Sequence, residues 1–250
     1  MGIRLGDANL RWNAGKTRMQ EMSLKSITKV LLRKHPGLLP FLFRVHNGLF
    51  GFNTVRIGYR GNRLQGTPFL SHCKILLTGK NNTIIFGTMS RLTRCTIHIF
   101  GNNNRVIIGD DCILHAGDFW IEDDGNCISV GNGTSISGST HLAATEGTNI
   151  LIGRDCMFSS EIAVRTGDSH SIIEAVSNIR INHASDVTIG DHVWIGNRAI
   201  LLKGSSVPDN SVVATGAIVT KKHDGANVIL AGSPAKVVRE NIDWLRARIR

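Results

Sequence analysis

The chain has 250 residues, 42% of them hydrophobic, which is enough for one or two domains with a buried core. Its 29 Lys and Arg against 19 Asp and Glu give a formal charge of +10, so we expect an anionic partner: a nucleotide cofactor, an acidic glycan, nucleic acid or a membrane face. Five cysteines without a CxxC pair argue against a disulfide framework or a zinc knuckle, and neither a signal peptide nor a spanning apolar run is recognisable, so we expect a cytoplasmic protein.

Residues 1–56 are predicted to form an arm and a helical cap. Residues 1–22 carry few organising signals, whereas 23–35 place Leu and Ile on one side and Lys and Arg on the other, which predicts a basic amphipathic helix. The apolar stretch 37–50 predicts a second, short helix. Two roles stay open for residues 23–50: a cap over the end of the fold that follows, or a peripheral contact with the inner, anionic face of a membrane.

A repeat with a 22-residue period begins near Leu64. Each period contains a hydrophobic residue followed by Gly, and four residues after that hydrophobic position stands a small residue. Polar corners rich in Gly and Asn separate the periods and suit left-handed backbone angles. The pairs are Phe86-Gly87, Ile108-Gly109, Val130-Gly131 and Ile152-Gly153, and the small residues are Ser90, Cys112, Thr134 and Cys156.

One interval breaks this rhythm. From Ile152 to the next such anchor, Ile189, there are 37 residues, which equals one 22-residue period plus 15. We therefore expect a loop inserted at about 168–184, beginning with the sequence Gly-Asp-Ser-His that ends at His170. A long loop in a compact repeat is usually functional.

A six-residue period occupies the stretch from Val187 to Lys222, with a large aliphatic in each hexad and a small or β-branched residue at its fifth position. Neither a helix nor a flat strand keeps this period, so the pattern predicts a β-solenoid in which three hexads make one triangular turn. We expect the aliphatics to point inward at the corners and the Gly that follows some of them to supply unusual backbone angles. About four 22-residue turns and two 18-residue turns are predicted, filling 57–225. A β-sandwich is the alternative.

The C-terminal segment 226–250 is predicted to form a turn at Gly232-Ser233-Pro234 and then a basic helix. Four apolar residues are expected on one face of that helix, closing the second end of the solenoid or packing on a neighbouring subunit: Val238, Ile242, Leu245 and Ile249.

The hexads also carry a family resemblance. IGDHVWIGNRAILLKG, followed by VATGAIVTKK and AGSPAKVVRE, resembles the hexapeptide-repeat acyltransferases, which implies an all-β, left-handed parallel β-helix and acetyl-CoA as donor. VRTGDSHSI and then GDHVWIG are similar to the capsular and polysialic acid O-acetyltransferases, in which a His at the loop start and a Trp in the following turn form the active site. His170 and Trp194 match these by motif and by their 24-residue separation. The resemblance further implies a homotrimer with its site between adjacent subunits.

The chemistry requires a base, because a sugar hydroxyl is a weak nucleophile at neutral pH. His170 is the candidate general base, acting in direct transfer without a covalent enzyme intermediate. Asp168 or a backbone carbonyl is expected to hold the other ring nitrogen. For Trp194, which should point outward, two roles stay open: lining the thioester or acceptor slot, or packing against a neighbouring subunit.

Cations gather where the coils end and suit the phosphates of CoA, while small residues leave room for its pantetheine arm. A solvated surface is the alternative for any one lysine. The candidate cofactor contacts are Trp194, Gly196, Ala214, Gly216, Ala217, Lys221, Lys222, Lys236 and Arg239.

We therefore expect an O-acetyltransferase acting on a hydroxyl of an anionic bacterial surface polysaccharide. Alternatives are N-acetylation of an amino-sugar nucleotide, acetylation of an antibiotic, or a non-catalytic solenoid that binds anionic polymers. No nucleic acid partner is expected, because basic and aromatic residues do not interleave. No metal is expected either, because the spacings of His98, His115 and His141 do not match the 22-residue register.

Overall fold

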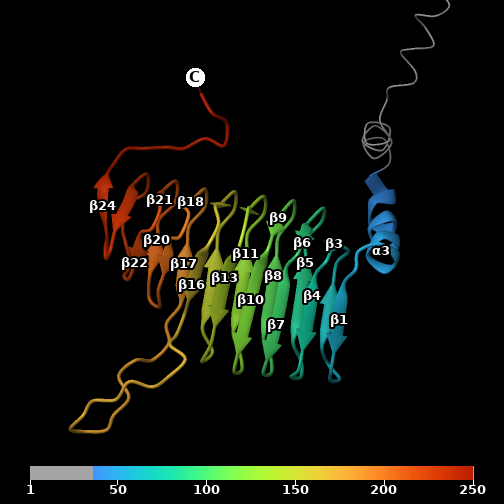
Figure 1. Ribbon diagram of the computed structural model, residues 1–250, viewed down its shortest axis with the longest axis horizontal. Helices are drawn as coiled ribbons and strands as arrows, with labels where there is room; N and C mark the ends of the chain where they lie inside the picture. Colours follow the sequence, from blue (N-terminus) through green and yellow to red (C-terminus); the bar gives the residue numbers. More distant parts are fainter. Residues whose placement is uncertain (1–35, 250) are drawn as a thin grey trace, which may run out of the picture. The chain divides into compact units, whose positions relative to one another are not determined.

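The computed structural model describes residues 36–249 (Figure 1). The chain divides into two compact units, residues 1–42 and 43–250. Of the first unit the structure describes a 3-10 helix, η1 (Pro36–Leu38), and the start of α3 (Leu39–Leu49). The amphipathic helix predicted for 23–35 lies outside the described residues.

The part of α3 that belongs to the second unit packs against the first turn of the repeat. The ring of His46 stacks on that of Phe69 with 4.2 Å between centroids. Asn47 donates to the carbonyl of Pro68 at 2.8 Å and accepts the N–H of Leu70 at 2.9 Å. These bonds satisfy backbone groups at the open end of the solenoid that would otherwise lack partners.

Three parallel sheets form the rest of the second unit, and each turn of the chain adds one strand to each sheet. This is the predicted left-handed parallel β-helix. The eight-stranded sheet contains β1 (Thr54–Ile57), β4 (Lys74–Leu77), β7 (Thr96–Phe100), β10 (Gly117–Glu122), β13 (Thr140–Ala144), β16 (Ile162–Arg165), β19 (Ile200–Leu201) and β22 (Ile218–Val219). The seven-stranded sheet contains β2 (Arg63–Gln65), β5 (Thr83–Phe86), β8 (Arg105–Ile108), β11 (Cys127–Val130), β14 (Asn149–Ile152), β17 (Val187–Ile189) and β20 (Ser206–Val207). The nine-stranded sheet contains β3 (Phe69–Ser71), β6 (Arg91–Thr93), β9 (Ile113–His115), β12 (Ser135–Ile136), β15 (Met157–Phe158), β18 (Trp194–Ile195), β21 (Val212–Val213), β23 (Ile229–Gly232) and β24 (Ala235–Arg239).

The strand register confirms both predicted periods. Ile108 pairs with Phe86 on one side and with Val130 on the other, at offsets of 22 residues. Ile189 pairs with Val207 at an offset of 18 residues, which is three hexads. Ile152 pairs with Ile189 across the inserted loop, an offset of 37. The solenoid is longer than the six turns predicted: it has about eight, because the chain already coils at β1, where we had expected only the cap.

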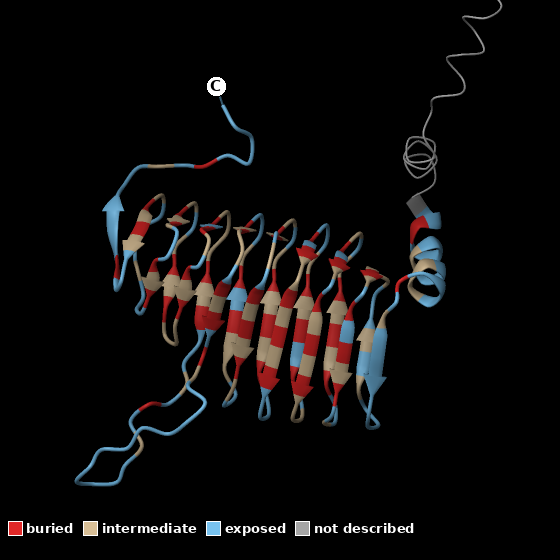
Figure 2. Ribbon diagram, viewed as in Figure 1, coloured by how far each residue is buried: buried red, intermediate tan, exposed pale blue. Residues whose placement is uncertain are grey.

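The interior is a narrow shaft of aliphatic side chains (Figure 2). Strand residues alternate between this shaft and the outside, as in β7 and β10, because successive side chains point to opposite faces of a sheet. The hexad aliphatics are buried as predicted, but they lie on the strands that form the flat faces and not at the corners. The small fifth residues and the cysteines Cys112 and Cys156 are also buried, so they pack inside the shaft.

Glycine is required after the aliphatic residues for a different reason from the one predicted. Gly109 and Gly131 do not adopt a positive φ; the left-handed residues stand two positions later, as at Asp111. A Cβ at Gly131 would instead meet the backbone of Gly153 in the next turn. Close stacking of successive turns, and not backbone angle, therefore demands glycine here.

The predicted C-terminal helix is wrong. β24 runs antiparallel to β23, and residues 240–249 continue as an extended strap over the edge of the nine-stranded sheet. Trp244 is 5% exposed in this strap, and its indole N–H donates to the carbonyl of His192 at 2.8 Å. These tertiary contacts outweigh the helical spacing of the apolar residues. Among residues 36–249 no helix is long and apolar enough to cross a membrane.

Candidate active site

The inserted loop joins β16 to β17 and projects away from the sheets (Figure 1). It spans 166–186, slightly more than the predicted 168–184. Its two arms pair with each other: Ile181 donates its N–H to the carbonyl of Ile172 at 2.9 Å, and Ile173 and Arg180 form an antiparallel bridge. The loop is therefore an ordered hairpin-like arm.

The base of the loop is fixed by polar contacts. Lys203, in the turn after β19, donates to Asp168 at 2.6 Å and to the carbonyl of Asn182 at 3.1 Å. The Lys203 hydrogen bond, with a second from Asn182, holds the pKa of Asp168 below its usual range. On the other arm, Arg180 forms an ion pair with Glu146, and this contact lowers the pKa of Glu146.

His170 lies at a cleft of about 590 Å³ beside this base. The cleft forms where the loop leaves the eight-stranded sheet, and its floor comes from the turns of β19 and β22 through Leu202, Lys203 and Thr220. The imidazole is exposed and makes no hydrogen bond to another residue in 36–249. Asp168, its predicted partner, is bonded to Lys203 and Asn182 instead.

A second cleft of about 360 Å³ adjoins the first on the outer face of the same sheet. The two clefts share Arg165, Gly167, Asp168 and Ser169. The second one also contains Trp120 and the pair His141–Asp118, in which His141 Nδ1 lies 2.8 Å from Asp118 Oδ2. None of the residues that only this second cleft contains was predicted as a site residue.

Trp194 lies on a different sheet from the clefts. It stands on β18 in the nine-stranded sheet, points outward as predicted with 39% of its surface exposed, and lines neither cleft. Its ring centroid is 6.2 Å from that of Trp244 in the C-terminal strap. A single copy of the chain therefore does not bring Trp194 and His170 into one cleft.

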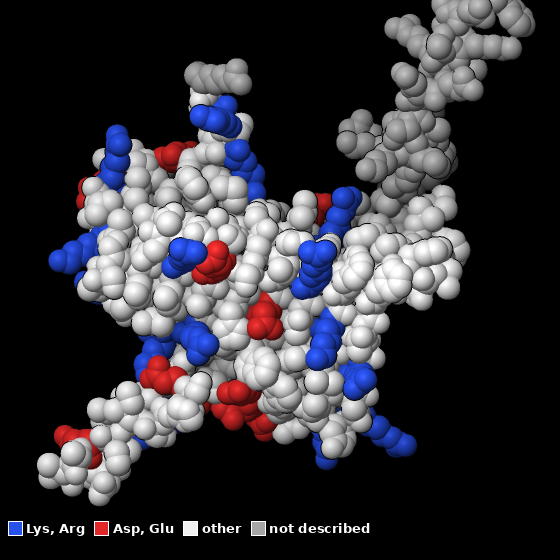
Figure 3. All heavy atoms as spheres, in the orientation of Figure 1, with Lys and Arg blue, Asp and Glu red and all other residues white. Residues whose placement is uncertain are grey.

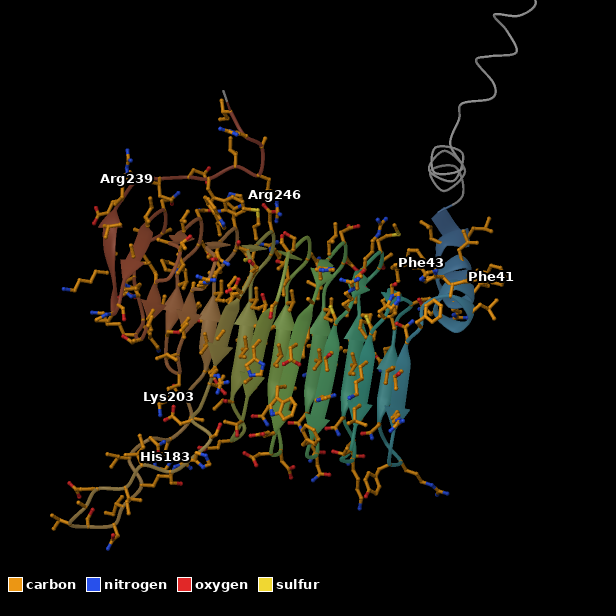
Figure 4. The ribbon with its side chains drawn as sticks, in the orientation of Figure 1. Phe41, Phe43, His183, Lys203, Arg239 and Arg246 are labelled. Atoms are coloured by element: carbon orange, nitrogen blue, oxygen red, sulfur yellow. The ribbon has the colours of Figure 1, made fainter. Side chains whose placement is uncertain are left out.

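The predicted cofactor contacts divide by burial. Ala217 belongs to the core and Gly196 is also buried, whereas Ala214 is half-buried and Gly216 is exposed. The four cations among these contacts are exposed and stand after β22 or on β24, and Figure 3 shows Lys and Arg side chains at both ends of the solenoid. Figure 4 shows Arg239 projecting from β24. The exposed cations are Lys221, Lys222, Lys236 and Arg239.

The three histidines considered as zinc ligands do not converge. His98 and His141 lie on the eight-stranded sheet and His115 on the nine-stranded sheet. Across the described part of the chain, no group of three or more His, Cys, Asp or Glu side chains could hold a metal ion.

Comparison with known proteins agrees with this fold. A polysialic acid O-acetyltransferase from Neisseria meningitidis is 35% identical over 190 residues, which cover 73% of this chain and 84% of the relative. The chain belongs to the hexapeptide-repeat acyltransferases. It is accordingly an acyltransferase, and not the non-catalytic scaffold considered above.

Further relatives extend the comparison within this acyltransferase family. A polysialic acid O-acetyltransferase from Escherichia coli O1:K1 is 34% identical over 122 residues, which span 49% of this chain but only 39% of the relative's length. The crystal structure of the polysialic acid O-acetyltransferase OatWY superposes with a TM-score of 0.67 at 30% identity, covering 79% of this chain and 89% of that one. The polySia-specific acetyltransferase NeuO superposes with a TM-score of 0.50 at 28% identity, covering 78% and 89%. No family model matches the chain.

The residues that fix the loop and shape the second cleft of this acyltransferase were not among those predicted from its sequence. Asn182 stands on the returning arm of the loop, 14 residues from Asp168, and Lys203 and Glu146 reach the loop from other turns, so no local motif unites them. Trp120 and Arg165 could have been found from the register, but one extra residue between β10 and β13 shifts the offset to 23, so that Trp120 pairs with Ala143.

Proposed function

We propose that this acyltransferase transfers an acetyl group from acetyl-CoA to a hydroxyl of an acidic bacterial surface polysaccharide, with His170 as the general base. The observation that carries the proposal is the position of His170: it lies on the long loop inserted between β16 and β17, at a cleft whose base is held by the Asp168–Lys203 ion pair. The names of the relatives support O-acetylation of a polysaccharide and not N-acetylation. A cytoplasmic location follows if acetyl-CoA is the donor.

The reaction is a direct acyl transfer. The His170 imidazole removes the proton of the acceptor hydroxyl as its oxygen attacks the thioester carbonyl carbon. The tetrahedral adduct collapses with cleavage of the carbon–sulfur bond, and the imidazolium returns the proton to the leaving thiolate. Imidazole as a side chain suits this task because it both accepts and returns a proton readily near neutral pH. The His170 side chain is exposed at the cleft and is therefore open to the acceptor hydroxyl.

We further propose that the site is completed by a second copy of the chain, in a homotrimer. Trp194 and the exposed cations Lys221, Lys222, Lys236 and Arg239 line neither cleft of their own chain. Packing of a neighbouring copy against the loop would bring these groups to His170, with the cations at the phosphates of CoA. The five exposed apolar residues of the loop arm suit such a contact: Ile172, Ile173, Val176, Ile179 and Ile181.

The test of the catalytic role measures release of CoA thiol with acetyl-CoA and polysialic acid. His170→Ala should lower kcat by about 10²- to 10⁴-fold, the usual contribution of a general base. His183→Ala is the matched control, since His183 is exposed in the same loop and lines neither cleft (Figure 4). Activity of the His170→Ala protein equal to that of this control would refute the assignment.

A peripheral membrane contact remains a separate proposal. Leu49 and Phe50, at the end of α3, are 71% and 62% exposed, and apolar side chains in a basic chain suit an anionic bilayer surface. Flotation with anionic vesicles should recover the intact chain and lose the variant with Leu49→Ser and Phe50→Ser. Equal recovery of the two proteins would exclude a contact through these residues.

A further inference from the structure

The second cleft exists because a small residue separates two large ones on the outer face of the eight-stranded sheet. Trp120 on β10 pairs with Ala143 on β13, and Ala143 pairs with Arg165 on β16. Consecutive strands lie about 4.8 Å apart, so Trp120 and Arg165 stand about 10 Å apart with only a methyl group between them. The result is a hollow with an aromatic wall, a guanidinium wall and a flat floor.

Polar groups at the rim of this hollow are held in place before any ligand binds. The Trp120 indole N–H donates to Glu122 at 2.8 Å, which fixes the plane of the ring. His141 Nδ1 and Asp118 Oδ2 lie 2.8 Å apart, so each side chain fixes the orientation of the other. They stand two residues before Ala143 and Trp120 on the same strands. Carboxylates and an aromatic plane around one hollow suit a sugar, because hydroxyls donate to carboxylate oxygens and the apolar face of a sugar ring packs on an indole.

Arg165 is the cation that both clefts share. Lys203, the other Lys or Arg at the His170 cleft, is already engaged by Asp168 at 2.6 Å. Among residues 36–249 the guanidinium of Arg165 has no ion-pair or hydrogen-bond partner, in contrast to Arg180 nearby, which is paired with Glu146. An unpaired guanidinium presents a planar fork of donors, the geometry that binds a carboxylate through two hydrogen bonds.

The carboxylates that line the cleft do not remove the preference of Arg165 for a ligand that carries a carboxylate. Asp168 is paired with Lys203, Asp118 is bonded to His141, and Glu122 accepts from Trp120. Each of them retains lone pairs for sugar hydroxyls. A ligand carboxylate is therefore directed to Arg165, and the remaining polar groups are left for its hydroxyls.

We propose that this cleft is the acceptor subsite and that Arg165 is the residue that selects an acidic sugar. One sugar unit lies over Ala143 with its ring against Trp120 and its carboxylate on Arg165. Because Arg165 also lines the adjoining cleft, a hydroxyl of the bound unit or of its neighbour in the chain reaches His170. This inference rests on the proposed O-acetyltransferase function and adds the basis of its acceptor selectivity.

The decisive experiment compares kcat/KM for polysialic acid and for the same polymer with its carboxyl groups reduced to alcohols. The wild-type protein should favour the acidic polymer by about 10-fold or more, the value of a charge-assisted hydrogen-bond pair. Arg165→Gln should bring this ratio close to one by losing rate on the acidic polymer alone, and Arg165→Lys should restore part of it. Arg105→Gln, on the outer face of the seven-stranded sheet, should behave like the wild type.

A ratio in Arg165→Gln equal to that of the wild type would overturn the inference while leaving the acetyltransferase function intact. If instead the wild-type protein acetylates neither polymer, the proposed function fails, and calorimetric binding of a sialic acid oligomer still judges the subsite. There, Arg165→Gln should weaken binding by about 10-fold or more, and unchanged affinity would refute the role of Arg165.

The floor of the cleft allows a second, steric test. Ala143→Leu would fill the hollow between Trp120 and Arg165, so it should raise KM for polysialic acid about 10-fold or more and leave CoA affinity unchanged. Ala163→Leu is the matched control, because Ala163 is a small outer residue of β16 that lines neither cleft. Equal KM values in the two variants would show that the acceptor does not lie over Ala143.

Discussion

The side-chain amide of Asn182 donates a hydrogen bond of 2.8 Å to the main-chain carbonyl of His170, across the base of the inserted loop. The same amide nitrogen donates to Asp168 at 2.8 Å, and the amide oxygen accepts the N–H of Ile172 at 2.7 Å. Asn182 is only 6% exposed, so these bonds are shielded from water. One buried side chain on the returning arm thus sets the path of the arm that carries the candidate base.

We predict that Asn182→Asp lowers kcat by about 10- to 100-fold, since a small displacement of a catalytic group has effects of this size. The carboxylate keeps the acceptor for Ile172 but replaces the two N–H donations with repulsion against Asp168 and the His170 carbonyl. Single-turnover acetyl transfer measures the change. Asn178→Gly is the control, because Asn178 stands near the loop tip at a positive φ that glycine accepts. Full activity in Asn182→Asp would show that the hydrogen bonds of the Asn182 side chain do not position His170.

The solenoid was predictable because the repeat that sets its strand register can be read from short stretches of the sequence. A residue that recurs every 22 or six positions can only be a repeated inward position on a coil, so anchors such as Ile108 and Ile189 identify their own strand partners. The inserted loop was found by the same arithmetic, since 37 residues exceed one period. The position of His170 at the start of that loop followed directly.

Side-chain contacts between different turns could not be predicted from the repeat pattern. Lys203 meets Asp168 because the chain folds back between two positions that are 35 residues apart, and Arg165 stands beside Ala143, which offers its guanidinium no polar partner. The C-terminal helix failed for the opposite reason: its apolar spacing was helical, but Ile242 exchanges two hydrogen bonds with Asn227, which hold it extended. Tertiary partners decide such segments, and a single sequence does not display them.

His192 should make docking of the C-terminal strap depend on pH. Its Nδ1 lies 2.7 Å from Asp155 and its Nε2 3.0 Å from the carbonyl of Trp244, with the carboxylate of Asp243 at 3.4 Å and the Arg246 guanidinium on the far side of Asp155. Partial burial disfavours the imidazolium, but the bonds to Asp155 and Trp244 outweigh it and raise the pKa of His192 above 6.5.

The pKa of His192 is higher in the folded protein than in the unfolded chain. The stabilisation of the strap by the His192 imidazolium is therefore fully present below pH 6.5 and is lost as the pH rises through the folded pKa. Amide exchange of residues 241–249, corrected for intrinsic rates, should therefore quicken as the pH rises above 6.5 and through the raised pKa of His192. His192→Asn, which suits the positive φ of this residue, should show fast exchange at all pH values. A wild-type strap whose protection does not change with pH would contradict the prediction.

Trp244 should be the main anchor of that strap. Its ring stacks on His192 with 4.2 Å between centroids and lies beside Trp194. Trp244→Ala removes a buried aromatic side chain and should lower the free energy of unfolding by about 3 kcal/mol, measured by urea denaturation. Leu245→Ala, at a neighbouring position that is 60% exposed, should change it by less than about 0.5 kcal/mol. Equal losses in the two variants would mean that the strap contributes no specific packing.

Gly131 tests the stacking of turns. Its missing side chain lets the backbone of Gly153 approach, and the atoms that a Cβ would meet are main-chain atoms that do not rotate away. Gly131→Ala should therefore lower the free energy of unfolding by about 1–3 kcal/mol, the range for overpacked interiors. Gly48→Ala is the contrasting variant: it lies inside α3 with no atom within 4 Å of the added Cβ, so it should stabilise the protein by about 0.5–1 kcal/mol. Urea denaturation of both proteins measures these changes in the free energy of unfolding, which should have opposite signs. No change in Gly131→Ala would mean that adjacent turns can separate to admit a methyl group.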